Sequence, residues 1–282
     1  MSSLSRKTSV AGLATAITLA GCGLVPPRLT EAWEAQDVGT KMVFEIKRKI
    51  FCETIDAIRE VNDTKTSLGK PIPDDYGLQM QLTLTIAESS SFTPNIGYNR
   101  TLPDGMESGV SIGQSWGVAV SGELSSTATR TDTTYTYWRV GSIAAPGKNK
   151  AVCSTDWPVD TSLSSPFLKS DLGIARFLKD NVKAADYLHS SKLGQKKPDN
   201  VDVYSYDLKF AVVSSGGVSP QFKLVSLSGG GTPILNLNRT RTHELLLTFG
   251  PTGPNGFQPS EISFSQHLTN QLNSSLSRRP GF

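Results

Sequence analysis

Apolar and polar residues alternate along the segment 78–86, where leucine, methionine and isoleucine are separated by glutamine and threonine. A period of two is typical of a β-strand with one buried and one solvated face. In the segments 43–61 and 168–188, apolar residues recur at intervals of three and four, which predicts an amphipathic helix in each. The segment 203–213 is a weaker copy of the strand pattern. The chain therefore presents the order helix, then strand, twice.

Similarity between the two halves of the sequence supports this repetition. The segment 80–94 aligns without gaps with 206–220, which lies 126 positions later, and 129–132 matches 240–243, which lies 111 positions later. The difference places an insertion in the first copy between about residues 95 and 125. Long hairpins are predicted in both copies, 110–124 with 127–140 and 222–227 with 234–249. These observations predict an α+β fold of two duplicated helix-plus-antiparallel-strand units, which could form one pseudo-symmetric sheet with helices on one face.

The expected domain organisation follows from these patterns. A signal segment covers 1–21, a tether 22–40, the first repeat 41–140, a linker 141–165, the second repeat 166–250 and a polar tail 251–282. In the tail, Leu268, Leu272 and Leu276 are spaced as on a helix, for which Ser260 is the predicted N-cap.

Composition excludes several classes of protein. Of 282 residues, 37% are hydrophobic, which suffices for a packed core and argues against a disordered chain. Lys and Arg number 28 against 25 acidic residues, a net charge of +3, which does not indicate a nucleic-acid partner. The sequence contains no CxxC or HxxxH pair, so no metal site is expected, and we expect no cofactor.

The N-terminus has the pattern of an export signal. Arg6 and Lys7 precede an apolar run at 10–19, which is half the length of about 20 residues that a membrane-spanning helix needs. This run is typical of a signal peptide, and it ends in Leu19-Ala20-Gly21-Cys22. With that motif, the first 22 residues resemble bacterial lipoprotein precursors, in which it forms the lipobox. The remainder of the chain resembles no characterised family.

The resemblance implies a lipid anchor. In lipoproteins of this kind the thiol equivalent to Cys22 receives a diacylglycerol, cleavage falls before it, and the new amino group is acylated, for example with palmitate. Two or three acyl chains hold a protein stably on a membrane. Gly23 at the second mature position implies sorting to the outer membrane of a Gram-negative cell, facing the periplasm. Cleavage removes Arg6 and Lys7 and no acidic residue, so the mature chain has no polybasic patch to assist the anchor.

Two further cysteines, Cys52 and Cys153, have two possible states. An extracytoplasmic location permits a disulfide, which would close a loop of about a hundred residues. The spacing alone equally allows two free thiols, because the geometry of the fold decides whether the pair can meet.

One motif resembles a catalytic site. Gly113-Gln114-Ser115-Trp116-Gly117 satisfies G-x-S-x-G, the nucleophile elbow of serine hydrolases, and Asp132 or Asp156 with His243 or His267 would complete a triad in the required order. The alternation continues after Gly117 as in a strand, whereas the elbow requires a helix there. We therefore expect no catalytic residue, and we expect His243 and Glu244 to form a surface cross-strand pair.

A further possibility is a membrane-inserting hairpin at 110–140. Apolar residues on 110–124 alternate with serine, glycine and alanine over a length that suits a membrane-spanning strand of about 9–11 residues.

From the sequence we expect a lipid-anchored envelope protein with a non-catalytic role, either in binding an envelope partner or in a structural assembly. The two alternatives are an oligomeric pore that inserts the hairpin 110–140, and a serine hydrolase centred on Ser115.

Overall fold

The computed structural model describes residues 26–30, 34, 38–63, 70–107, 110–154, 158–187, 202–218, 222–223, 227–229 and 235–277. Cys22 and the predicted signal segment lie outside these residues. The described chain forms two compact units. The helical unit comprises Arg28–Leu84, Asp132–Phe210 and Thr242–Phe282. The strand unit includes Thr85–Thr131 and Ala211–Arg241. Both predicted repeats contribute to both units.

Four long strands contribute to each unit. They are β1 (Tyr76–Phe92), β4 (Leu124–Arg139), β5 (Tyr204–Val218) and β8 (Leu235–Pro251), and they form a sheet in the order β4-β1-β8-β5. β1 and β5 run from the helical unit into the strand unit, whereas β4 and β8 return. Each strand therefore runs antiparallel to its neighbours in the sheet. Helices together with an antiparallel sheet confirm the predicted α+β class.

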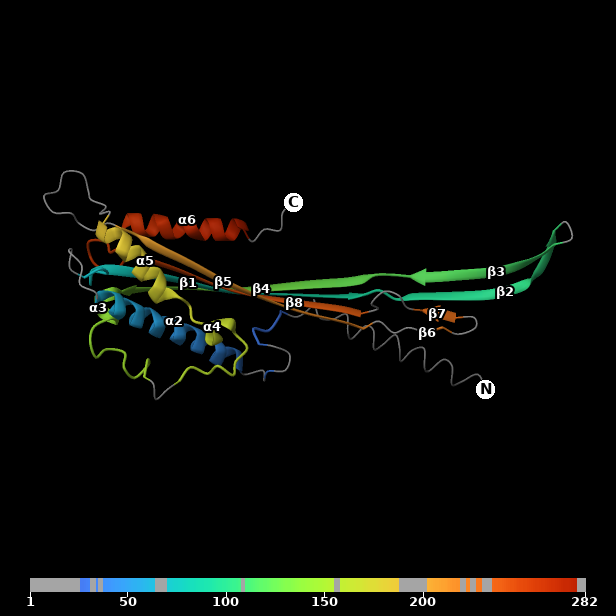
Figure 1. The fold of residues 1–282 in the computed structure, drawn as a ribbon, viewed down its shortest axis with the longest axis horizontal. Helices are drawn as coiled ribbons and strands as arrows, with labels where there is room; N and C mark the ends of the chain where they lie inside the picture. The colour runs from blue at the N-terminus through green and yellow to red at the C-terminus, as the bar shows by residue number, and fades with distance from the viewer. Residues whose placement is uncertain are drawn as a thin grey trace. The chain divides into compact units, whose positions relative to one another are not determined.

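In the helical unit, two long helices cover one face of the sheet: α2 (Val38–Asn62) and α5 (Ile174–Tyr187) (Figure 1). The helical spacing of α2 places Ile46, Ile50 and Ile58 on one side, where all three are fully buried. Burial of such a side chain stabilises the fold by about 1.5–3 kcal/mol. Two short helices, α3 (Val140–Ile143) and α4 (Pro166–Lys169), belong to the same unit.

The other face of the sheet is covered by α6 (Glu261–Ser277), the helix of the tail, so the sheet carries helices on both faces (Figure 1). Gln79 of β1 points to this face and its Nε2 donates to the carbonyl of Ser263 at 2.9 Å. The alternation predicts a solvated face for the polar positions of this strand, but Gln79 is buried and bonds to a helix. The helix begins where predicted, because the amide of Ser263 donates to Oγ of Ser260 at 3.4 Å, which confirms the N-cap.

The second predicted helix is shorter than expected. The segment from Leu168 onward does not form one helix, because α4 ends at Lys169 and α5 begins at Ile174. Gly173 between them has φ of +69°, a left-handed conformation that interrupts a right-handed helix. Its amide donates to Oδ1 of Asp171 at 2.8 Å, which fixes the turn before α5.

The strand unit contains a second sheet of β2 (Asn95–Glu107), β3 (Val110–Ser121), β6 (Phe222–Lys223) and β7 (Leu227–Gly229), in the order β3-β2-β7-β6. β3 pairs with β2 and β4 lies beside β1, so the predicted hairpin of 110–124 with 127–140 is wrong, as is 222–227 with 234–249. The amide of Gly122 donates to the carbonyl of Pro94 at 3.3 Å. Pro94 and Gly122 thus mark a joint at which two paired strands continue, and they do not form a turn.

Candidate functional site

The β2–β3 hairpin has two chemically different faces. Residues that are paired across the two strands lie on the same face, and the register pairs Ile96 with Val120, Tyr98 with Val118 and Arg100 with Trp116. We call this side the apolar hairpin face; with Leu102, which pairs with Gln114, it comprises Ile96, Tyr98, Arg100, Leu102, Gln114, Trp116, Val118 and Val120. The opposite side, the polar hairpin face, carries small or polar residues: Asn95, Gly97, Asn99, Thr101, Ser111, Gly113, Ser115, Gly117, Ala119 and Ser121. Met106 is the exception: beyond the register shift between Leu102 and Gly105 it pairs with Ser111, and it is 77% exposed.

The apolar hairpin face is exposed. Its large apolar side chains range from 41% exposed at Tyr98 to 67% at Val120. Such a contiguous apolar surface is uncommon on soluble proteins and marks a site of interaction with a membrane or another protein. The residues of β3 whose side chains are described are exposed on both faces, so neither face rests on a core. β7 pairs with β2 only at Ile96–Tyr98, so from Asn99 onward the hairpin is a two-stranded ribbon among the described residues. Such a ribbon has little stability in water unless something covers it.

Arg100 is the one charged residue of the apolar hairpin face as we define it. It pairs with Trp116, and its side chain is exposed. A long arginine side chain can lay its methylene groups along an apolar surface and carry its guanidinium toward water.

Ser115 lies within β3, and the strand continues past it to Ser121. It pairs with Thr101 of β2 on the polar hairpin face. A nucleophile elbow needs a sharp turn from strand to helix at the serine, and the structure has a straight strand there. The G-x-S-x-G segment is therefore a strand of glycine and serine alternating with larger residues. Asp156 lies outside the described residues.

His243 and Glu244 do not form a surface pair, because both are buried in the helical unit. Nδ1 of His243 is 2.9 Å from Oγ of Ser165, and its ring stacks on Phe167 with centroids 5.9 Å apart. Glu244 faces α6 and accepts a hydrogen bond from Ser274. Ser165 is fully buried, so this serine and histidine form a structural contact that a substrate cannot reach. Burial of these groups depends on α4 and α6, which the local sequence pattern does not indicate.

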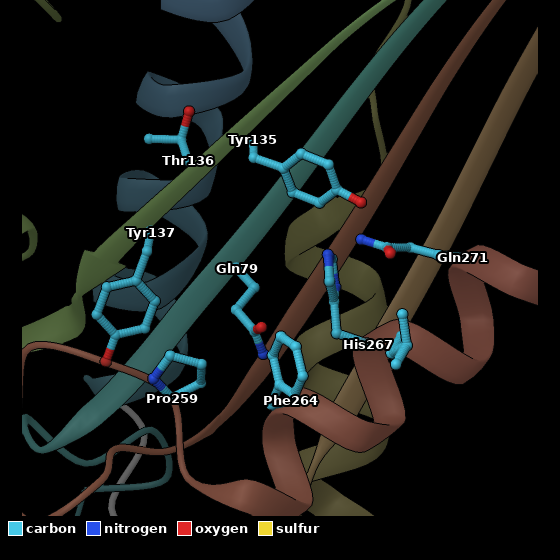
Figure 2. Close-up of a pocket in the computed structure, with 9 residues that line it drawn as sticks. Gln79, Tyr135, Thr136, Tyr137, Pro259, Phe264, His267 and Gln271 are labelled. Carbon is cyan, nitrogen blue, oxygen red and sulfur yellow. The ribbon is translucent and has the colours of Figure 1, made fainter.

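The helical unit contains a pocket of about 540 Å³ between α6 and the strands β1 and β4. Figure 2 shows Tyr135 and Tyr137 of β4, Gln79 of β1, and Phe264 and His267 of α6 around it. Nδ1 of His267 is 2.8 Å from Oγ1 of Thr248, and burial lowers the pKa of this histidine to about 4. Nε2 of His267 and the hydroxyl of Tyr137 are buried and have no hydrogen-bond partner among the described residues.

The sequence did not reveal this pocket. It forms because α6 packs over an edge strand that is more than a hundred residues away along the chain. The alternating Tyr135 and Tyr137, on a strand that otherwise consists largely of threonine, are the only local signal.

Cys52 of α2 and Cys153 are joined by a disulfide, with sulfurs 2.04 Å and Cα atoms 5.4 Å apart. The structure thus has one of the two states that the sequence left open. The same helix also holds the segment around Cys153 through Arg48, whose guanidinium donates to the carbonyl of Pro158 at 2.9 Å and pairs with Glu45 at 2.7 Å.

Two observations concern the described residues only. No group of three potential metal ligands occurs among them. No helix in this part of the chain combines the length and the apolar character that a membrane span requires.

No protein family matches this chain, and no curated protein matches it. Among solved structures, the secretin InvG of the Salmonella SPI-1 type III secretion injectisome, in its open gate state, aligns with 71% of this chain and 66% of its own at 8% identity and a TM-score of 0.18. The InvG secretin domain from the injectisome NC-base aligns with 72% of this chain and 70% of its own at 7% identity and a TM-score of 0.14. These scores are too low to define a shared fold.

Proposed function

We propose that this chain is a lipid-anchored subunit of an oligomeric pore in a bacterial outer membrane, and that it acts without catalysing a reaction. The membrane-inserting element is the β2–β3 hairpin, in place of the segment 110–140 that the sequence indicated. The observation that carries the proposal is the division of this hairpin into one exposed apolar face and one small, polar face.

The dimensions of the hairpin suit a membrane. β2 has 13 residues and β3 has 12, whereas a tilted membrane-spanning strand needs about 9–11. Membrane strands alternate between side chains that meet lipid and side chains that meet water. Ile96, Trp116, Val118 and Val120 would meet lipid, and the serine, glycine, threonine and asparagine residues of the polar hairpin face would line an aqueous passage.

Arg100 opposes insertion of the hairpin, but its cost does not outweigh the gain from the apolar side chains. An arginine on the lipid face of a membrane strand costs about 2–4 kcal/mol at the bilayer centre and less near the interfaces. Removing a fully exposed large apolar side chain from water contributes about 1.5–3 kcal/mol, so a half-exposed one contributes about half of that. The hairpin presents six that are 41–67% exposed, Ile96, Tyr98, Leu102, Trp116, Val118 and Val120.

The lipobox and the disulfide both support a location in the periplasm. The lipobox at 19–22 would place a diacylglycerol on Cys22 and export the chain. A disulfide between Cys52 and Cys153 persists in the oxidising periplasm and is rare in the cytosol. Mass spectrometry of the membrane-extracted protein would show the lipid on Cys22, and Cys22→Ala would abolish both the modification and the cleavage before it.

We also propose that the fold arose by duplication. Helix α2 with β1 and β4 would form one copy, and α5 with β5 and β8 the other. The order β4-β1-β8-β5 then sets the two copies side by side in the same orientation. The alignment offsets support this arrangement: they relate the neighbouring Ser205 and Thr248, whose hydroxyls are 3.3 Å apart, to Gln79 and Tyr137, which line one pocket.

The hairpin is tested by two lysine substitutions on adjacent residues. Val118 lies on the apolar hairpin face and Ala119 on the polar face. Val118→Lys should weaken insertion by about 2–4 kcal/mol, which is at least about 30-fold in the equilibrium constant for insertion of the hairpin. The lipidated protein would be added to phosphatidylethanolamine and phosphatidylglycerol vesicles that contain a fluorescent dye, and dye release would be recorded.

Ala119→Lys is the matched control, because it adds the same charge to the same strand. It should retain dye release. Equal loss in both variants, or full dye release by Val118→Lys, would contradict the proposed pore.

A further inference from the structure

We infer that neighbouring copies of this chain join edge to edge, with β5 of one copy pairing antiparallel with β4 of the next. This inference rests on the proposed function and names the interface through which the pore would assemble. In the described part of the chain, β4 and β5 are the two outer strands of their sheet, and neither pairs with another strand on its outer side. Long open edges of this kind offer unpaired amide and carbonyl groups to another chain.

The strand directions are compatible with this pairing. Since β1 and β5 run one way and β4 and β8 the other, directions alternate across β4-β1-β8-β5. The next strand after β5 must run in the direction of β4 to continue the antiparallel pattern. A second copy in the same orientation supplies it. The interface joins two different edges, so it is of the head-to-tail type, which closes into a ring when the rotation between copies is suitable.

The second sheet has the same lateral order. Along the chain, β2 follows β1 and β3 precedes β4, while β6 follows β5 and β7 precedes β8. If each strand of the second sheet is matched with its neighbour along the chain, the order β3-β2-β7-β6 corresponds to the order β4-β1-β8-β5. The segments β3–β4 and β5–β6 therefore supply the two outer strands of both sheets.

The contact between β1 and β8 inside the chain serves as the template for the contact between chains. If β1 corresponds to β5 and β4 to β8, then β5 meets β4 of the next copy as β1 meets β8. Glu88 of β1 and Arg239 of β8 form an ion pair in the strand unit. The offsets of 126 and 111 relate them to Ser214 of β5 and Ala128 of β4. Ser214 is thus expected to lie against Ala128 of the neighbouring copy.

The β4 edge also carries apolar surface that a neighbour would cover. In the helical unit, the pocket is lined by Tyr135 and Tyr137 of this edge strand together with α6. Phe264 and Leu268 of α6 line the same pocket and are 54% and 42% exposed. A strand of a second copy placed on β4 would remove part of this surface from water.

The test is a pair of cysteines in the lipidated full chain, reconstituted in phosphatidylethanolamine and phosphatidylglycerol vesicles. In the double variant Ser214→Cys with Ala128→Cys, mild copper-catalysed oxidation should produce a ladder of cross-linked species on a non-reducing gel. A mixture of the two single variants should stop at the dimer, because each chain then has one reactive edge. Ser215→Cys with Ala128→Cys is the control, since Ser215 points to the opposite face of β5 and should not cross-link.

The outcomes separate this interface from the proposed function. A ladder from the 214/128 pair and none from 215/128 supports the interface. Two outcomes would overturn the interface and leave the proposed pore intact. One is dye release by oligomers that the 214/128 pair does not cross-link, and the other is equal cross-linking by the 214/128 and 215/128 pairs. Monomers that release no dye would overturn the proposed function, and the interface with it. Unfolding in urea at the midpoint of the unmodified protein would show that the variants fold.

Discussion

The rings of Tyr98 and Trp116 meet edge to face on the apolar hairpin face, with centroids 6.0 Å apart and planes inclined by 72°. Tyrosine and tryptophan combine an apolar ring with one polar atom, which favours places where a protein passes from water into lipid. The pair therefore provides a spectroscopic probe within the proposed membrane element.

We expect the fluorescence of Trp116 to shift to the blue when the protein meets phosphatidylethanolamine and phosphatidylglycerol vesicles, because the ring leaves water. The chain has four tryptophans, so the measurement uses a variant in which the other three are phenylalanine. A variant that retains Trp138 alone is the control, since Trp138 packs on Phe51 with centroids 5.3 Å apart. An unchanged Trp116 spectrum would show that the hairpin stays in water.

Arg100→Leu should increase membrane insertion. The substitution removes the charged residue that pairs with Trp116 and replaces it with an apolar side chain. The lipid-face cost of arginine predicts a gain of about 2 kcal/mol or more, which is about 30-fold in partition into vesicles. Asn99→Leu changes the polar hairpin face and should give no such gain. Weaker partition of Arg100→Leu than of the unmodified protein would contradict the assigned faces.

Loss of the disulfide should destabilise the fold without breaking another contact. Cys52 and Cys153 are 101 residues apart, and closing such a loop is worth about 4–5 kcal/mol in the chain-entropy treatment. The urea midpoint of the mature protein should therefore fall when dithiothreitol is added. In the double variant Cys52→Ser with Cys153→Ser the midpoint should already be low and should not respond to the reductant. A midpoint of the unmodified protein that dithiothreitol leaves unchanged would show that the bond contributes little.

The buried His267 should make stability depend on pH. Burial lowers its pKa from 6.5 to about 4, so between these values the unfolded chain binds more protons than the folded one. The free energy of unfolding should rise from pH 4 to pH 6.5, with a contribution on the order of 3 kcal/mol from this residue. His267→Gln should flatten the profile measured by urea unfolding.

Glu53 should act in the opposite direction. Burial raises its pKa from 4.5 to about 6, so the folded chain binds more protons in that range and the contribution of Glu53 to stability falls as pH rises. Glu53→Gln should therefore steepen the rise between pH 4.5 and 6. If His267→Gln and Glu53→Gln both flatten, or both steepen, the dependence of stability on pH, one of the two pKa shifts is assigned wrongly.

The local pattern of the chain predicted its elements where a single period was clear. The alternation at 78–86 became the core of β1, the helical spacing at 43–61 became α2, and Ser260 caps α6. Each of these features depends on residues two to four positions apart, because the strand and helix periods are properties of the backbone. The lipobox is likewise a short motif, and the lipid anchor remains a prediction from it.

The pairing of the strands and the covering of their faces depended on contacts over long distances in the chain. Both β2 and β4 are β-strands that could have paired with β3, and the joint between Pro94 and Gly122 selects β2. The polar positions of β1 are compatible with solvent or with a helix, and at Gln79 it is α6 that makes the contact, from 184 residues away. Periodicity fixes which side chains share a face, whereas the free energy of packing determines what meets that face. For the apolar face of the β2–β3 hairpin, which no other described element covers, we propose that lipid does so.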